Sequence, residues 1–256
     1  MVCSLAKSTD ADIVVLCEST VDGSCTLKRL QDDVNTAFNI PKPTSRKRFQ
    51  CFSRNPTLDF SQVHSGFRTS VHSLNLPSLP NSLLALVHGV DIQNYDTEER
   101  QSFAQSLATE LKFVRNDRRT DRLIVMGDFN MNPFDRGMNL AAGLNAMMAK
   151  SCVVAGTRKH LGAEYDLYYN PMWSLLGDLS AGPPGTIYDT SRRGPYGWSM
   201  LDQVILSHSL VDILQDVQIL TSTGDHSLID GNGRPSHKVA SDHLPLMLTL
   251  RGNENE

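Results

Sequence analysis

The amino-acid sequence predicts an α/β fold of alternating strands and helices. Apolar runs of strand length occur at residues 13–17, 83–88, 123–126, 201–207 and 244–250, and short apolar runs of this kind are typical of buried strands. Patterns of helical period separate several of them. Each run also carries an aspartate, glutamate or histidine at or near one end, so the strands deliver polar groups as well as a core.

The elements of the first third follow from apolar spacing and from capping residues. A short helix is expected before a turn at residues 9–12, because its apolar residues fall on one face. Ser24 or Thr26 can cap a second helix that stops before Pro41. Further strands are expected at residues 50–53 and 67–72.

Two more helices are predicted around the central strands. Asp96 and Glu99 have the spacing of a capping box, which starts a long helix whose apolar stripe is Phe103, Leu107, Leu111 and Val114. Residues 136–150 are predicted to form another helix after the turn at Pro133.

The regular pattern fails over residues 160–197, a stretch too long for an idle connection. Together with Trp198 it holds five of the six tyrosines and both tryptophans. Aromatic rings beside Arg192 and Arg193 suit a substrate that joins a phosphate to a flat or apolar group, so we expect a substrate-side loop insertion here. The alternative is an ordered loop that packs its own aromatic rings.

Composition and length fit a single domain that spans residues 1–256, with 40% apolar and 20% charged residues. No apolar run has membrane-spanning length and the start lacks the pattern of a secretory signal, so a cytoplasmic location and no membrane span are expected. The five cysteines lack Cys-x-x-Cys spacing, which argues against a disulfide framework or a zinc site.

The formal net charge of −4 excludes the global basic field of a typical non-enzymatic nucleic-acid-binding domain. Only local basic patches remain. The patches at residues 46–48 and 115–122 are expected to be solvated faces, whereas Arg192 and Arg193 are the better candidates for substrate binding.

The tetrapeptide Gly127-Asp128-Phe129-Asn130 follows the apolar run 123–126 directly. At strand periodicity Asp128 and Asn130 face the same way, so both can converge on a hydrated phosphate with a divalent cation. The alternative is plain turn chemistry, because Gly, Asp and Asn all favour turns.

Other polar residues accompany this motif along the chain. Glu18 and His88 end two of the strands, Asp202 lies inside a third, and Ser241-Asp242-His243-Leu244-Pro245 opens the last apolar run. Taken singly, His88 would be a satisfied histidine at the core edge, Asp202 a strand-edge charge and Glu18 a solvent-facing strand end. Their joint occurrence favours a shared site.

In this order and spacing, these motifs resemble the endonuclease/exonuclease/phosphatase superfamily, from about residue 12 to residue 250. Its members include deoxyribonucleases, abasic-site endonucleases, sphingomyelinases and inositol-phosphate 5-phosphatases. The resemblance implies a four-layer α/β sandwich, in which two mixed sheets pack face to face and helices cover the outside. It also implies a metal-dependent phosphoesterase that uses Mg²⁺ or Mn²⁺.

The resemblance further implies a role for each residue. Glu18 is the expected first metal ligand, with Asp242 contributing, as suits a cation that prefers a few carboxylates and water. Asp128 and His243 would share the activation of water or contact with the phosphoryl group, and Asp202 would orient His243. Asn130 and His88 are expected to donate to phosphate oxygens, and His88 alternatively protonates the leaving group.

One feature departs from the family pattern, because the family begins with a strand that carries a metal-binding Asn. This chain starts inside the helix that normally follows, so we expect the native chain to begin upstream of Met1. The alternative is that other parts of the chain compensate for the missing strand. The first hypothesis is a metal-dependent phosphodiesterase, in particular a nuclease. The alternatives are a phosphomonoesterase or phospholipase-type esterase, and a catalytically weak binding or regulatory protein.

Overall fold

A seven-stranded mixed sheet forms the centre of the computed structural model, which describes residues 1–34, 37–41, 48–54, 60–76, 79–190 and 197–252. Two neighbouring pairs are parallel, β5 with β6 and β10 with β7, and the others are antiparallel. In spatial order the strands are β3 (Gln62–Ser65), β4 (Thr69–Leu76), β5 (Leu79–His88), β6 (Leu123–Asp128), β13 (Asp202–Ser207), β10 (Tyr168–Tyr169) and β7 (Ala146–Met147).

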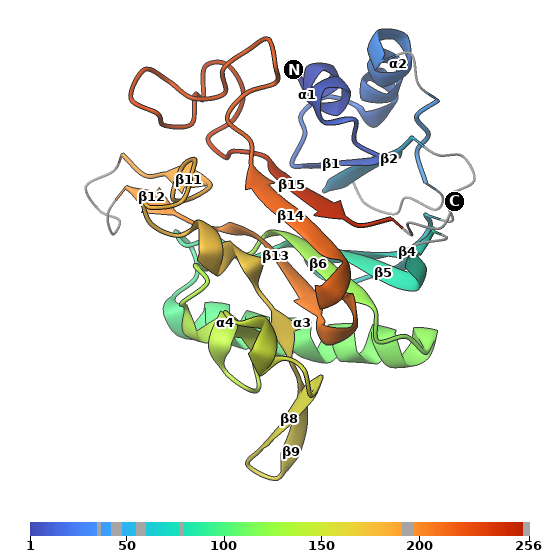
Figure 1. Cartoon of the computed structure of the whole chain (residues 1–256), viewed down its shortest axis with the longest axis vertical. Helices are drawn as coiled ribbons and strands as arrows, with labels where there is room; N and C mark the ends of the chain where they lie inside the picture. The colour runs from blue at the N-terminus through green and yellow to red at the C-terminus, as the bar shows by residue number, and fades with distance from the viewer. Residues whose placement is uncertain (35–36, 42–47, 55–59, 77–78, 191–196, 253–256) are drawn as a thin grey trace.

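The long helix α3 (Thr97–Arg118) covers one face of this sheet (Figure 1). Its predicted capping box is confirmed, since Asp96 accepts from the backbone of Glu99 and the Glu99 side chain accepts from the backbone of Asp96. Its apolar stripe packs on the alternate strand residues that face it, which are Leu83, Ala85, Val87, Leu123, Val125 and Ile205.

The opposite face of the sheet packs against two antiparallel strand pairs. These are β1 (Ile13–Cys17) with β2 (Phe49–Ser53), and β14 (Leu214–Ile219) with β15 (Leu246–Leu250). Both pairs share one core with Leu84, Ile124 and Val204 of the sheet. The second layer thus consists, within the described residues, of two separate pairs.

Helices α1 (Val2–Thr9) and α2 (Gly23–Val34) form the outermost layer, beyond β1 and β2 (Figure 1). Ala6 and Leu30 bury their side chains there against Phe52. The predicted layered α/β fold, with helices outside two strand layers, is confirmed. No helix of the described part of the chain has the length and apolar character needed to cross a bilayer.

The predicted helix over residues 136–150 is wrong, because α4 (Arg136–Asn139) ends after four residues. The chain turns back so closely that a Cβ on Gly143 would lie 2.3 Å from the carbonyl oxygen of Gly137. Asn145 is fully buried and donates to the Asp166 carbonyl at 2.7 Å. These tertiary contacts prevail over the local helical pattern.

The segment predicted to be an irregular insertion, residues 160–197, contains regular structure in its described part. The hairpin of β8 (Thr157–His160) and β9 (Ala163–Asp166) projects from the body of the molecule (Figure 1). Tyr168 and Tyr169 are buried core residues of β10. The segment also contains the 3₁₀ turn η2 (Pro171–Leu175) and β11 (Ile187–Tyr188), which forms a short hairpin with β12 (Trp198–Ser199). Two further 3₁₀ turns, η1 (Lys150–Cys152) and η3 (His208–Ile213), lie before and after the segment.

Candidate active site

Three of the predicted site residues stand on one rung of the central sheet. Asp128 at the end of β6 pairs with His88 at the end of β5 and with Asp202 at the start of β13. All three share the strand alternation of Leu86, Ile124 and Val204, which face the second layer. Their side chains therefore face the second layer at one edge of the sheet.

The turn after β6 brings Asn130 back onto Asp128. Asn130 adopts a left-handed backbone conformation (φ 51°), and its backbone N–H and side-chain amide donate to the two carboxylate oxygens of Asp128 at 2.7 and 3.0 Å. The carboxylate and the amide therefore contact each other through a turn, which was the alternative to strand alternation. Their shared binding of a phosphate and a cation stays a prediction.

Glycines make this rung compact. Gly127 has φ 143°, and a Cβ on it would lie 2.1 Å from the Val87 carbonyl oxygen on the neighbouring strand. A Cβ on Gly89 would lie 2.2 Å from the Phe129 carbonyl oxygen. Side chains at either position would push β5 and β6 apart where they present His88 and Asp128.

His243 reaches the same edge from the start of the last apolar run. Its Nδ1 lies 2.7 Å from the Asp202 carboxylate, and its backbone forms an isolated bridge with Ile187. Burial alone would lower the pKa of His243, but the hydrogen bond and charge of Asp202, with the charges of Asp128 and Asp242, outweigh it and raise the pKa to about 9.

The pKa of Asp128 is also raised, because its buried carboxyl group lies among other acidic side chains. Burial raises its pKa to about 6, and the charges of Asp202 and Glu18 act in the same direction. His243 and the Asn130 backbone hydrogen bond oppose the rise. A carboxylate of this kind is a better proton acceptor near neutral pH than an ordinary aspartate.

His88 lies against groups from the second layer. Its Nδ1 is 2.7 Å from the Arg48 guanidinium and 3.5 Å from Glu18 Oε1, and its Nε2 is 3.9 Å from Asp128 Oδ2. Burial lowers the pKa of His88, Glu18 opposes this, and the cations Arg48 and Arg68 add to it. The expectation that residues 46–48 form a solvated face is wrong for Arg48, which contacts His88. No local signal distinguishes it from its basic neighbours.

The two predicted metal ligands are exposed beside His88 and His243. Glu18 directly follows β1, with its side chain 67% exposed beside His88, and the exposed Asp242 precedes His243. No group of three His, Cys, Asp or Glu converges on a point within the described residues. The donor set still fits Mg²⁺, which is commonly held through one or two carboxylates and several waters, and the like charges that raise the pKa of Asp128 favour a cation.

Of the predicted substrate-binding residues, Arg192 and Arg193 lie outside the described residues. Trp198 packs edge-on against Tyr188, with ring centroids 5.3 Å apart, in the hairpin that adjoins the Asp202 strand. The guanidinium of Arg234 lies 4.1 Å from the Tyr188 ring centroid. Arg234 was not predicted, because the loop that carries it has no pattern that points to the site.

Three exposed apolar side chains belong to loops at the same end of the sheet. They come from the turn before β4 and from the loops that follow β5 and β6, all of which leave the sheet at the end that carries the rung. The Arg68 guanidinium ties two of these loops together by donating to the Gly89 carbonyl at 2.7 Å. The side chains are Phe67 (67% exposed), Ile92 (50%) and Phe134 (59%).

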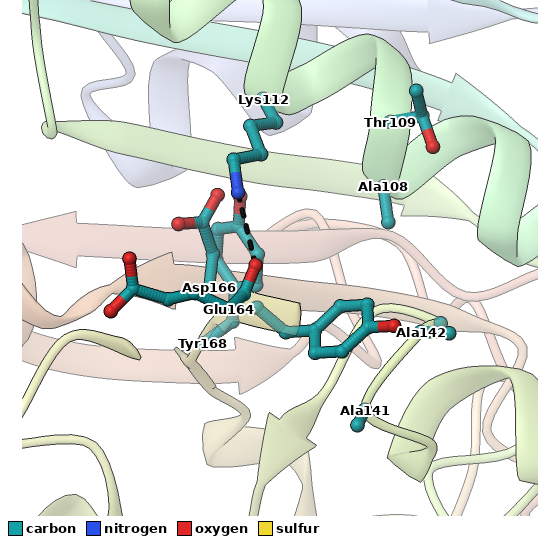
Figure 2. A pocket seen from close by; sticks show the side chains of 10 residues that line it. Ala108, Thr109, Lys112, Ala141, Ala142, Glu164, Asp166 and Tyr168 are labelled. Carbon is teal, nitrogen blue, oxygen red and sulfur yellow. Dashed lines mark hydrogen bonds between the residues drawn. The ribbon is translucent and has the colours of Figure 1, made fainter. Parts of the chain in front are cut away.

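A separate small pocket of about 140 Å³ lies away from the rung, between α3, the loop after α4 and β9. Lys112, Glu164, Asp166 and Tyr168 are among its lining residues, and Lys112 Nζ donates to the Glu164 carbonyl at 3.1 Å (Figure 2). Tyr168 pairs with Ser207, at the far end of β13 from Asp202. The pocket is therefore not part of the candidate active site.

Several solved structures share the fold across nearly the whole chain. A mannosyl-6-phosphatase of Bacteroides thetaiotaomicron is 14% identical with a TM-score of 0.58, covering 97% of this chain and 88% of its own. A 3′–5′ exonuclease of Neisseria meningitidis is 16% identical with a TM-score of 0.55, covering 96% and 91%. The human Nocturnin catalytic domain is 16% identical with a TM-score of 0.52, covering 95% and 83%.

No curated protein matches the sequence. The model of the endonuclease/exonuclease/phosphatase family matches residues 1–243, which include the rung residues and His243. Members of this family are hydrolases of nucleic acids or other phosphate esters and generally use divalent metals. On the strength of that match, the chain belongs to the endonuclease/exonuclease/phosphatase family.

Proposed function

We propose that this protein hydrolyses phosphodiester bonds of nucleic acid, in a reaction that depends on Mg²⁺ or Mn²⁺. The observation that supports the proposal most is the rung of His88, Asp128 and Asp202, completed by the 2.7 Å contact between Asp202 and His243. It gathers a proton acceptor, an oriented imidazole and a second imidazole at one edge of a rigid sheet. Phosphate-ester hydrolysis needs these functions together.

In the proposed reaction Asp128 accepts the proton of the attacking water. Its raised pKa of about 6 suits this role near neutral pH. His243, whose pKa of about 9 keeps it protonated at neutral pH, binds a phosphoryl oxygen and is held in place by Asp202. The Asn130 backbone N–H fixes the Asp128 carboxylate. Its side-chain amide exchanges the hydrogen bond to Asp128 for one to a phosphate oxygen.

Glu18 and Asp242 would hold the divalent cation. A bound cation would polarise the phosphoryl group and offset the negative charge that accumulates on it. Both carboxylates are exposed, so a hydrated ion can reach them. His88 lies beside Glu18 and donates to a substrate oxygen.

Aromatic and apolar side chains at the rung end of the sheet favour nucleic acid as the substrate. Tyr188 and Trp198 lie in the hairpin whose Ile187 forms a bridge with His243. Phe67, Ile92 and Phe134 are exposed on loops that leave the sheet at the same end. Nucleobases stack on such surfaces without a requirement for sequence. The net charge of −4 disfavours long stretches of duplex contact, so a single strand or a strand end is the preferred substrate.

A fluorescent panel of single-stranded and duplex DNA and RNA tests the proposal, with Mg²⁺ or Mn²⁺ compared with EDTA. We expect metal-dependent cleavage that is lost in Asp128→Ala and retained in Asp216→Ala, a matched exposed aspartate on β14. Retained cleavage in Asp128→Ala would assign the activity to another site or to a contaminant.

The second candidate is hydrolysis of a small or lipid phosphate ester. The acidic net charge favours it, and the likeness to a mannosyl-6-phosphatase is compatible with it. The same panel should therefore include sugar phosphates, inositol phosphates and sphingomyelin. Activity on these substrates alone would replace the nuclease assignment and keep the same site residues.

A further inference from the structure

Arg48 is a cationic side chain that contacts the rung and that the proposed reaction leaves without a role. It lies directly before β2, and its backbone carbonyl accepts the Glu18 N–H at 3.0 Å. This hydrogen bond continues the pairing of β1 with β2 by one residue, and it holds Arg48 next to Glu18. Its side chain then spans to the central sheet, where Nη1 meets His88 Nδ1 at 2.7 Å.

The chemistry of arginine decides which His88 nitrogen carries the proton. A guanidinium has N–H donors and no acceptor, and it stays charged in proteins. A 2.7 Å contact with a ring nitrogen is therefore a hydrogen bond only if that nitrogen offers its lone pair. Nδ1 of His88 must be the acceptor, so a neutral ring carries its proton on Nε2.

This arrangement opposes that of the other imidazole at the site. Nδ1 of His243 faces the Asp202 carboxylate at 2.7 Å and must donate to it. Nε2 of His88 faces Asp128 Oδ2 at 3.9 Å, too far for a direct hydrogen bond. The Nε2–H group can therefore donate to another oxygen that binds at the rung, such as one from a substrate.

We propose that Arg48 is a positioning residue that holds His88 as a neutral imidazole protonated on Nε2, so that His88 donates a hydrogen bond to the phosphate ester undergoing hydrolysis. The catalytic part of this inference rests on the proposed function. Without Arg48, the partner that the described residues leave beside Nδ1 is Glu18 Oε1 at 3.5 Å, which as a carboxylate can only accept. Loss of the guanidinium hence favours the opposite tautomer, in which Nε2 has no hydrogen to donate.

The direct test is the ¹⁵N spectrum of the imidazole rings at pH 8, without metal and with Mg²⁺. His88 is identified among the eight histidines as the signal that is missing in His88→Gln. We expect the wild-type ring to carry its proton on Nε2, Arg48→Lys to retain this form, and Arg48→Met to give a detectable Nδ1–H form. A wild-type ring protonated on Nδ1, or an unchanged ring in Arg48→Met, would overturn the proposal.

Kinetics provide the second readout. Arg48→Met should lower kcat by about 100-fold, the lower end of the range for a lost general acid or base, with KM changed less than about twofold, and Arg48→Lys should recover most of the loss. Arg54→Met is the matched control, because Arg54 directly follows β2 and pairs with Asp10 and Asp12. If KM alone rises, or if Lys is as poor as Met, Arg48 does not act through His88.

The two readouts separate this inference from the proposed function. The tautomer is measured on the folded protein without turnover, so it tests the link between Arg48 and His88 even if no nucleic acid is cleaved. A correct tautomer with no hydrolysis of any phosphate ester would contradict the proposed function and keep the positioning role of Arg48. Hydrolysis by a protein whose His88 ring is protonated on Nδ1 would support the proposed function and contradict the positioning role of Arg48.

Discussion

The Asp202 carboxylate and the His243 imidazole lie 2.7 Å apart although they are 41 positions apart in sequence. Asp202 starts β13 and His243 precedes β15, so the contact joins the two strand layers at the end of the sheet that carries the rung. A carboxylate placed against Nδ1 fixes the ring orientation and stabilises the imidazolium. Their relationship is therefore the most direct link between the fold and the proposed chemistry.

Replacing Asp202 with Asn tests that link. The amide oxygen can still accept from Nδ1, but the charge is gone, so burial should bring the pKa of His243 down from about 9. We expect kcat to fall by roughly 10²- to 10⁴-fold, the usual range for disturbed acid–base groups. NMR titration of His243 and steady-state kinetics would measure both effects. Asp212→Asn, an exposed aspartate in η3, is the control that should change neither.

Asp128→Asn should abolish turnover and leave the fold steadier at neutral pH. The folded pKa of Asp128 is raised from 3.8 to about 6, so its protonated form is the one that folding favours. Stability from this group is present below pH 3.8 and lost as the pH rises through 6. At pH 7.5 the free energy of unfolding of Asp128→Asn should exceed that of the wild type by up to roughly 3 kcal/mol. At pH 3.5 the two should be almost equal. Urea unfolding without metal measures this difference.

The outcome that would contradict the Asp128 assignment is marked destabilisation with activity retained. Glu18→Gln is the companion variant, and we expect it to abolish turnover with an intact fold as well. Its side chain is exposed, so its stability should change little in the absence of metal.

Much of the site could be predicted from the sequence because its residues sit at strand ends. Strand alternation and sheet register convert His88, Asp128 and Asp202 into neighbours across three strands, and apolar runs reveal strands well. The capping box before α3 could also be predicted, because it depends only on residues three positions apart.

The rest of the site depends on contacts that no local pattern encodes. Arg48 reaches His88 from the second layer, and Arg234 reaches Tyr188 from a loop without periodicity. The short α4 shows the same limit, because Gly143 and Asn145 are set by tertiary packing. Long-range partners of this kind can be found only when the layers are assembled.

His72 should make the protein sensitive to mild acid. It is buried in β4, stacks on Phe60 at 4.8 Å, and its Nδ1 has no hydrogen-bond partner among the described residues. Burial lowers its pKa from 6.5 to about 4, so the folded state disfavours the charged form. Its contribution is present above pH 6.5 and is lost as the pH falls towards 4, by up to roughly 3 kcal/mol.

Urea unfolding of His72→Gln between pH 7 and pH 4 checks this assignment. The variant should lose stability less steeply than the wild type across that range, even if its stability at pH 7 is lower. His160→Gln, an exposed position in the β8–β9 hairpin, should keep the wild-type slope. Equal slopes for wild type and His72→Gln would show that other groups carry the acid sensitivity.

Gly127→Ala should damage stability and activity together. The added Cβ would meet the Val87 carbonyl oxygen at 2.1 Å, and this backbone atom cannot move without separating β5 from β6. The backbone at φ 143° is also unfavourable for alanine. We expect a loss of roughly 3 kcal/mol or more, measured by urea unfolding. Gly231→Ala, where nothing lies within 4 Å of the new atom, should be neutral.

Addition of Mg²⁺ should stabilise the folded protein, because a ligand that binds only the native state must do so. At a free concentration 100 times the dissociation constant the gain is about 2.7 kcal/mol, which for a chain of this length raises Tm by about 5 to 11 °C. Glu18→Gln should remove most of the shift, whereas Glu164→Gln, on the β8–β9 hairpin away from the rung, should keep it. No shift at millimolar Mg²⁺ or Mn²⁺ would favour a binding or regulatory protein on this scaffold. A shift that survives in Glu18→Gln would instead move the metal site to other carboxylates.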